Sequence, residues 1–156
     1  MPDDLWLTDI YTWSQRQADR LRRLRAGERP NDLDWDNIIE EIESVGNSAV
    51  DAVRSNLIQC VAHLIKLHAW PDSDSVRAWR HEAITLLGNA QDRYRPSMAS
   101  ALDIGSVYRR ALKRSDLDFL PTPTRSIPRH AEVPLVAVAD EDFTIDDLAA
   151  ALFPPP

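Results

Sequence analysis

Hydrophobic residues recur at helical spacing in the first third of the chain. One series, with intervals of three, four, four and three residues, predicts a helix that begins near Thr8 or Asp9 and ends at Gly27. Its apolar face comprises Ile10, Trp13, Gln17, Leu21 and Leu24. After the loop at Pro30, Asp34 is the expected cap of a second helix, with Asn37 in a capping-box-like position.

In the second predicted helix, apolar and acidic residues lie on different sides. Ile38, Ile42 and Val45 follow a 3.6-residue period, and Ile39 widens this apolar face. Glu40 and Glu43 lie on the polar side, whereas Glu41 is on the flank, close to the apolar face. Gly46 is expected to end this helix, to bend it, or to let another helix pack closely.

A third helix is predicted from about Ser48 to Trp70, where Pro71 stops it. Its apolar surface is unusually wide, which is typical of the central helix of a bundle. One row of this surface holds Val50, Val53, Leu57, Val61, Leu64 and His68, with Cys60 at its border, and an adjoining row holds Ile58 and Ile65.

The rest of the chain predicts two more long helices and an irregular ending. Ser75 is the expected cap of a fourth helix that closes near Arg95, and a fifth covers about Met98 to Arg114. Prolines between Asp116 and Asp142 exclude long helices there. A capping pattern of Thr144 and Asp147 begins a short final helix.

The predicted fold class is therefore all-α. We expect an up-and-down bundle of about five helices, a proline-rich C-terminal arm and a short final helix. The predicted division is a helical bundle domain over residues 1–115, with residues 116–156 packed on the same domain as an irregular arm and final helix.

Composition narrows the classes of function. The net charge of −7 argues against a general nucleic-acid or anionic-membrane binder. The single cysteine, Cys60, excludes an intrachain disulfide and a multi-cysteine metal site. No apolar segment approaches the length of a membrane span, and the acidic N-terminus lacks the basic region of a secretory signal. A cytoplasmic location is therefore expected.

Several ordered motifs resemble a known bacterial family. Its opening is similar to Asp9–Trp13 with Gln17-Ala18 and Leu21-Arg22, and its central signature resembles Leu33–Glu43 with Gly46. His63–Lys66 and Arg77–Arg80 match two later landmarks, so the resemblance covers roughly residues 9–115. The family is domain of unknown function 29. The resemblance implies a bacterial, all-helical bundle, and it implies no reaction, cofactor or catalytic residue.

Two features depart from that family pattern. Leu67 stands where the family usually has an aromatic residue after the lysine. The region from Asp116 to Asp142 is longer and richer in proline than the usual family ending.

The strongest candidates for chemistry are Glu41, His63, Lys66 and Arg80. Antiparallel helices can bring a carboxylate to an imidazole, a pair that serves acid–base catalysis or metal binding. A polar layer of ion pairs between helices is the alternative, and helical-wheel positions favour it. His63 and His68 are five residues apart, which does not place two metal ligands on one face. Cys60 is more typical of a small buried residue than of a nucleophile. No metal or cofactor is predicted.

Three hypotheses of function remain open from the sequence. The leading one is a non-enzymatic protein-interaction module, with a protein partner or self-association, because no compact catalytic constellation is evident. The second is an acid–base or metal-dependent enzyme that uses the Glu/His/Lys cluster. The third is a nucleic-acid-associated protein that uses the arginines of the first helix, against which the acidic neighbouring segment argues. Trp6 and Trp70 are the expected partner-surface tryptophans, and the sequence does not determine whether the protein binds a small molecule.

Overall fold

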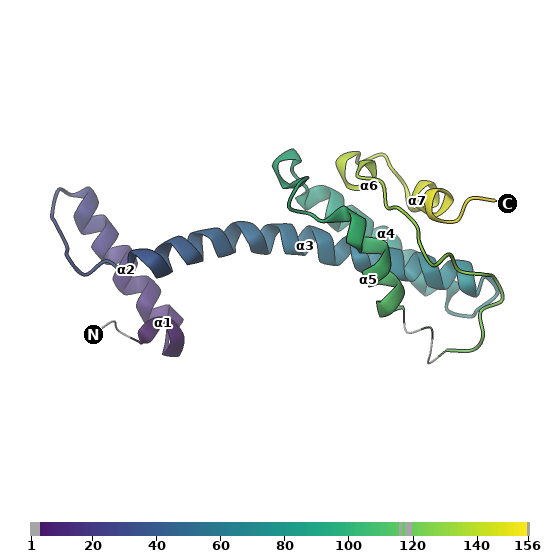
Figure 1. The fold of residues 1–156 in the computed structure, drawn as a ribbon, viewed down its shortest axis with the longest axis horizontal. Helices are drawn as coiled ribbons and strands as arrows, with labels where there is room; N and C mark the ends of the chain where they lie inside the picture. Colours follow the sequence, from purple (N-terminus) through teal and green to yellow (C-terminus); the bar gives the residue numbers. More distant parts are fainter. Residues whose placement is uncertain (1–3, 116, 118–119, 156) are drawn as a thin grey trace. The chain divides into compact units, whose positions relative to one another are not determined.

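The computed structural model describes residues 4–115, 117 and 120–155, so predictions for residues 1–3, 116, 118, 119 and 156 lie outside the described part. The described residues form helices and no strand, which confirms the all-α prediction. The α-helices are α1 (Leu5–Thr8), α2 (Ile10–Arg25), α3 (Trp35–Ala69), α4 (Val76–Arg93), α5 (Val107–Arg114), α6 (Val136–Ala139) and α7 (Ile145–Leu152) (Figure 1).

The chain divides into two compact units, residues 1–47 and residues 48–156. This partition differs from the predicted one at residue 115, because helix α3 contributes to both units and the arm belongs with the helices before it.

The N-terminal unit is organised around the carboxylate of Asp34. Its Oδ2 accepts hydrogen bonds from Trp13 Nε1 at 3.0 Å and Asn37 Nδ2 at 2.8 Å. The Asp34 backbone N–H donates to Gln17 Oε1 at 3.1 Å, which ties α2 to the start of α3. Hydrogen bonds from Asn37 and Trp13 lower the pKa of the Asp34 carboxyl. Asp9 is the side-chain cap of α2, as expected, because it accepts from the Thr12 backbone N–H.

The second and third predicted helices are one continuous helix, α3, of 35 residues. Gly46 therefore neither ends a helix nor separates two of them. A Cβ added at Gly46 would meet no atom within 4 Å, so a close helix contact does not explain this glycine either. By contrast, Gly27 follows α2 with a φ of 91°, a left-handed conformation that glycine adopts without strain.

The C-terminal unit contains one hydrophobic core built on the second half of α3. Helix α4 turns back along α3, and α5, α6 and α7 add side chains to the same cluster (Figure 1). Val53, Leu57, Val61 and Ile65 of α3 are completely buried in it. The wide apolar surface predicted for residues 48–70 is thus the central surface of this unit.

The predicted fifth helix, from Met98 to Arg114, is shorter than expected. Short 3-10 turns occupy Pro96–Met98 and Ile104–Ser106, and the α-helix begins only at Val107. Between the two turns, Asp103 adopts a left-handed φ of 51°. The Arg54 guanidinium donates to the backbone oxygens of Ala101 and Leu102, at 2.7 and 2.9 Å. These bonds satisfy carbonyls that a continuous helix would have used internally.

The described part of the arm is irregular, as predicted, except for one short helix. Residues Val136–Ala139 form α6, and Ala137 and Val138 are buried in the core. The predicted cap of the final helix is confirmed: Thr144 and Asp147 form a capping box at the start of α7. Ser75 precedes α4 as predicted, but its side chain makes no capping hydrogen bond.

Because Leu148 of α7 is completely buried, we expect Leu148→Ala to destabilise the protein by about 2–5 kcal/mol. Ile84→Ala is the matched control, since Ile84 is 53% exposed on α4 and its truncation should change stability by less than about 0.5 kcal/mol. Urea unfolding measures both. Equal stability of the two variants would contradict a final helix that is integral to the core.

Candidate functional site

The four predicted site residues are distributed over both units. Glu41 belongs to the N-terminal unit, whereas His63, Lys66 and Arg80 belong to the C-terminal unit. Glu41 Oε1 accepts a hydrogen bond from Trp6 Nε1 at 3.0 Å, which links α1 to α3. The side chain of Glu41 therefore has a structural partner within its own unit.

His63 and Lys66 lie one turn apart on α3, and both are half-buried. The Nδ1 atom of His63 is buried and has no hydrogen-bond partner among the described residues. Burial lowers the pKa of His63, and the positive charge of Lys66 lowers it further, against the opposing charge of Glu82. His63 is therefore held in its neutral form more strongly than a free histidine.

Arg80 is bound by Asp146, which the sequence did not identify as its partner. Two parallel hydrogen bonds, from Nη1 to Oδ1 at 2.9 Å and from Nη2 to Oδ2 at 2.8 Å, join α4 to α7. This pairing lowers the pKa of Asp146 and raises that of Arg80. Both side chains are largely exposed, so the pair fixes the position of α7 with little gain in stability.

No set of three His, Cys, Asp or Glu residues among those described comes together in a way that could hold a metal ion. Cys60 is completely buried, and burial raises the pKa of its thiol to about 12. A thiol held so strongly in the protonated form is a poor nucleophile. Cys60 therefore acts as a small core residue, as its position on α3 indicated.

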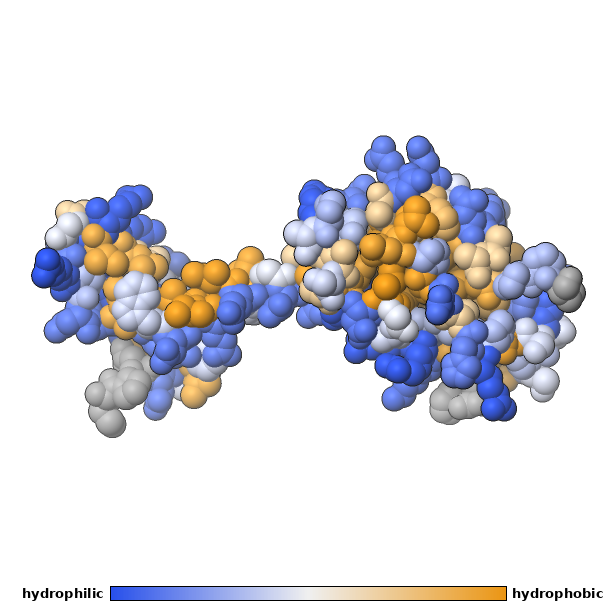
Figure 2. Space-filling view, turned by 45° about the horizontal axis from the view of Figure 1, so that its top comes forward, coloured by the Kyte–Doolittle hydropathy of each residue, from blue (hydrophilic) through white to orange (hydrophobic). Residues whose placement is uncertain are grey.

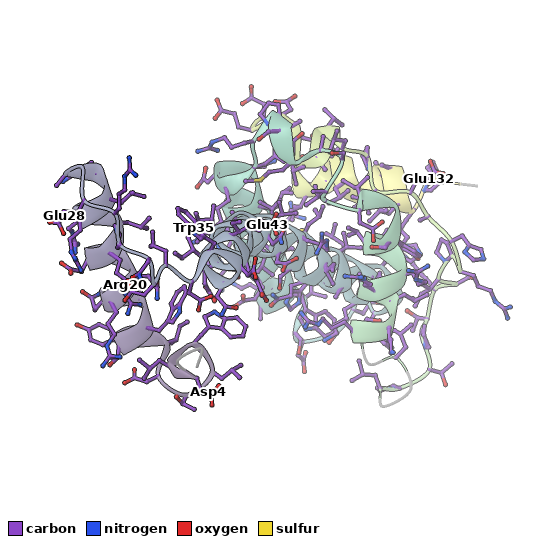
Figure 3. All side chains as sticks on the ribbon, turned by 60° about the vertical axis from the view of Figure 1, so that its left-hand side comes forward. Asp4, Arg20, Glu28, Trp35, Glu43 and Glu132 are labelled. Carbon is purple, nitrogen blue, oxygen red and sulfur yellow. The ribbon has the colours of Figure 1, made fainter. Side chains whose placement is uncertain are left out.

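The arginine-rich helix α2 is partly neutralised by the loop that follows it. Arg20 pairs with Asp32 at 2.6 Å, and Arg23 pairs with Glu28 at 2.7 Å (Figure 3). Among the described residues, neither Arg22 nor Arg25 forms an ion pair. The basic side of this unit thus combines internally paired and solvated arginines.

The predicted apolar face of the second helix is mostly exposed. Only Ile38 is buried; Trp35, Ile39, Ile42 and Val45, here called the apolar stripe, are exposed by 52%, 52%, 68% and 74%. These four residues fall within about a third of the helix circumference. Figure 2 shows hydrophobic residues gathered on the surface of the N-terminal unit. Trp35, labelled in Figure 3, is thus an exposed tryptophan, whereas Trp70, expected at a partner surface, is buried.

Within the C-terminal unit, sequence reasoning missed the residues that line a cavity of about 530 Å³ at the junction of α3 and α4. Trp70 and Trp79 both contribute to it. The sequence contains one signal for this cavity, a tryptophan on each side of the turn-rich segment 71–75. Helical periodicity could not place the proline-rich arm, which completes the wall of the cavity.

These features define an all-α protein with a helical core and an exposed apolar stripe. No described helix has both the length and the apolar character that crossing a membrane requires. The chain belongs to the family described as domain of unknown function DUF29, whose model matches residues 5–144. The match confirms the resemblance and extends it through the whole proline-rich region 116–142.

A solved structure is similar over nearly the whole chain. It is the crystal structure of an α-helical protein of unknown function from Rhodospirillum rubrum, with 32% sequence identity and a TM-score of 0.68. The similarity covers 92% of this chain and 94% of that one. No functionally curated protein matches the chain.

The lowered pKa of His63 predicts a pH-dependent stability. Between its folded and unfolded pKa values, the unfolded state binds more protons, so stability falls as the pH decreases through the ordinary histidine pKa. We expect His63→Leu to flatten the dependence of the unfolding free energy on pH between about pH 8 and about pH 5. Urea unfolding across this range measures the slope. A His63→Leu slope equal to that of the wild type would contradict the assignment, and His130→Gln, in the exposed arm, controls for loss of a histidine.

The Arg80–Asp146 pair predicts a small coupling energy. In a double-mutant cycle with Arg80→Ala and Asp146→Ala, we expect about 0.2–1 kcal/mol of coupling, because water screens both side chains. The coupling should decrease as salt is added. A coupling well above this range, or one insensitive to salt, would contradict a solvent-exposed structural pair.

Proposed function

We propose that this chain is a non-enzymatic protein-interaction module that self-associates through the apolar stripe of its N-terminal unit. The observation that supports it most is the exposure of Trp35, Ile39, Ile42 and Val45 on one side of α3. Contiguous exposed hydrophobic residues with polar neighbours are typical of protein-binding surfaces. Their intervals of four, three and three residues match the spacing of helix–helix seams.

The small core of the N-terminal unit favours association. Among its described residues, only Trp13, Gln17 and Ile38 are buried, whereas Leu7, Ile10 and Tyr11 are exposed together with the apolar stripe. A unit of 47 residues is close to the size at which disulfides, metals or oligomerisation usually supplement the core. Cys60, the single cysteine of the chain, lies outside this unit. Burial of the stripe against another protein supplies the missing apolar contact.

Charge complementarity favours a second copy of the chain as the partner. Asp36, Glu40 and Glu43 extend from the part of α3 that bears the stripe, and they make no ion pair within the described residues. Arg22 and Arg25 of α2 are likewise unpaired there and belong to the same unit. In a two-fold dimer each surface occurs twice, and in the proposed dimer the acidic residues of one copy lie against the basic residues of the other.

The alternative hypotheses have less support. The carboxylate of Glu41 is bound by Trp6, and the guanidinium of Arg80 is bound by Asp146, so both groups have structural partners. Two of the arginines in the basic first helix are paired with acidic residues of the following loop. The proposal keeps the bacterial, cytoplasmic setting expected from the sequence, where the thiol of Cys60 remains reduced.

Replacement of the most central stripe residue tests the proposal. We expect the wild-type protein to be dimeric at about 10 μM and Ile42→Ser to be monomeric, because the substitution places a polar hydroxyl in the centre of the interface. Sedimentation equilibrium measures the mass, and circular dichroism verifies that helix content is unchanged.

Ile84→Ser is the matched control. Ile84 is also an exposed isoleucine on a helix, but it belongs to the C-terminal unit, so this variant should remain dimeric. A wild-type protein that stays monomeric up to about 100 μM would refute self-association. Dissociation of both variants alike would refute the assignment to the apolar stripe.

A further inference from the structure

The cavity of about 530 Å³ in the C-terminal unit has a distinctive lining. Its volume is within the range of small-molecule sites, about 300–1,000 Å³. Apolar side chains form part of the wall, and every charged side chain that lines it is a carboxylate. The lining residues are Trp70, Asp72, Ser73, Asp74, Ser75, Trp79, Leu120, Pro121 and Thr124.

Two indole rings meet at this cavity. The ring centroids of Trp70 and Trp79 are 6.3 Å apart, with an angle of 53° between the ring planes. The rings are therefore tilted and do not stack face to face. Trp70 is almost completely buried, whereas Trp79 is half-buried. The negative face of an indole attracts a cation that lies within about 6 Å of the ring centre.

The aromatic wall is held in place by the arm. Trp70 Nε1 donates to the backbone oxygen of Pro121 at 3.1 Å. The backbone N–H and the hydroxyl of Thr124 both donate to the oxygen of Ala69, each at 2.9 Å. Hydrogen bonds from the arm thus satisfy the carbonyl of the last residue of α3. The arm also holds the indole of Trp70 in position before a ligand binds, which reduces the entropy cost of binding.

The two carboxylates of the cavity are exposed. Asp72 and Asp74 make no hydrogen bond or ion pair with any other residue that the structure describes. Their position just before α4 stabilises the N-terminus of that helix. The helix terminus alone, however, does not account for an adjoining cavity with two tryptophans.

From this arrangement we propose that the cavity binds an organic cation of the alkylammonium class, with the methyl or methylene groups against Trp79 and the positive charge facing Asp72 and Asp74. Aromatic faces next to carboxylates recognise both parts of such a ligand. A free amine and a methylated lysine side chain of another protein share this chemistry. The site belongs to the C-terminal unit, and it is independent of the apolar stripe.

Choline and its uncharged isostere 3,3-dimethylbutan-1-ol test the proposal. We expect saturable binding of choline, seen as shifts of the indole N–H signals of Trp70 and Trp79 in nuclear magnetic resonance spectra, and no saturable binding of the alcohol. Trp79→Phe assigns one of the two signals. Equal binding of choline and the alcohol, or binding of neither choline nor a trimethyl-lysine peptide, would overturn the proposal.

The double variant Asp72→Asn with Asp74→Asn should weaken choline binding by about tenfold or more, because both facing charges are lost. Asp92→Asn with Glu132→Gln removes the same charge from exposed positions outside the cavity and should bind as the wild type does. If both double variants lost the same affinity for choline, net charge alone would explain the effect, and the proposed site would be wrong.

A short neutral peptide that contains trimethyl-lysine distinguishes the two sources of the cation. Tighter binding of the peptide than of choline supports a protein partner, and binding of choline alone supports a free amine. Thermal unfolding, followed by circular dichroism, verifies that each variant retains the wild-type fold.

Discussion

The C-terminal unit depends on removing one face of α3 from water. Val53, Leu57, Val61 and Ile65 are completely buried, and α4, α5, α6 and α7 all add side chains to the cluster around them. Each such side chain contributes about 1.5–3 kcal/mol by leaving water, far more than the exposed Arg80–Asp146 pair contributes. The polar contacts have a different role: they select one arrangement among many that would bury the same apolar area. Arg54 does so for the turn before α5, and Gln91 does so for the arm through the backbone oxygens of Ala137, Asp140 and Phe143.

Helical periodicity was sufficient to predict the fold class and the positions of α2, α4 and α7, because each of these helices has a local capping or stopping signal. It was insufficient at Gly46, where a glycine within a helix costs only about 1 kcal/mol and the neighbouring turns of α3 outweigh that cost. It also failed at residues 98–106, since the left-handed Asp103 and the carbonyls held by Arg54 depend on a residue almost fifty positions away. Local patterns contain no information about such a partner.

The predicted site residues illustrate the same limit. Glu41 and Arg80 were predicted as candidates for one chemical site, whereas in the structure each has its own partner, Trp6 and Asp146, from a distant segment. The apolar face of residues 38–45 was correctly recognised, although periodicity shows only that a face is apolar and cannot show whether the same chain covers it. Trp35 and Trp70 make this point most clearly, because the tryptophan expected at a surface is buried and the other is exposed.

The two halves of α3 form one helix, but their apolar residues have different environments. In the second half, α4, α5, α6 and α7 of the same unit add side chains to the cluster on its apolar face, so this wide apolar surface is a core. The first half has a narrower apolar stripe and a dense row of carboxylates, and α1 and α2 are the other helices described in its unit. A helix with that composition is stable in water because Asp34 fixes its start and the continuous hydrogen-bond ladder extends it. The helix thus forms with Trp35, Ile39, Ile42 and Val45 exposed, and these side chains are the apolar surface that association would add to the small core of the unit.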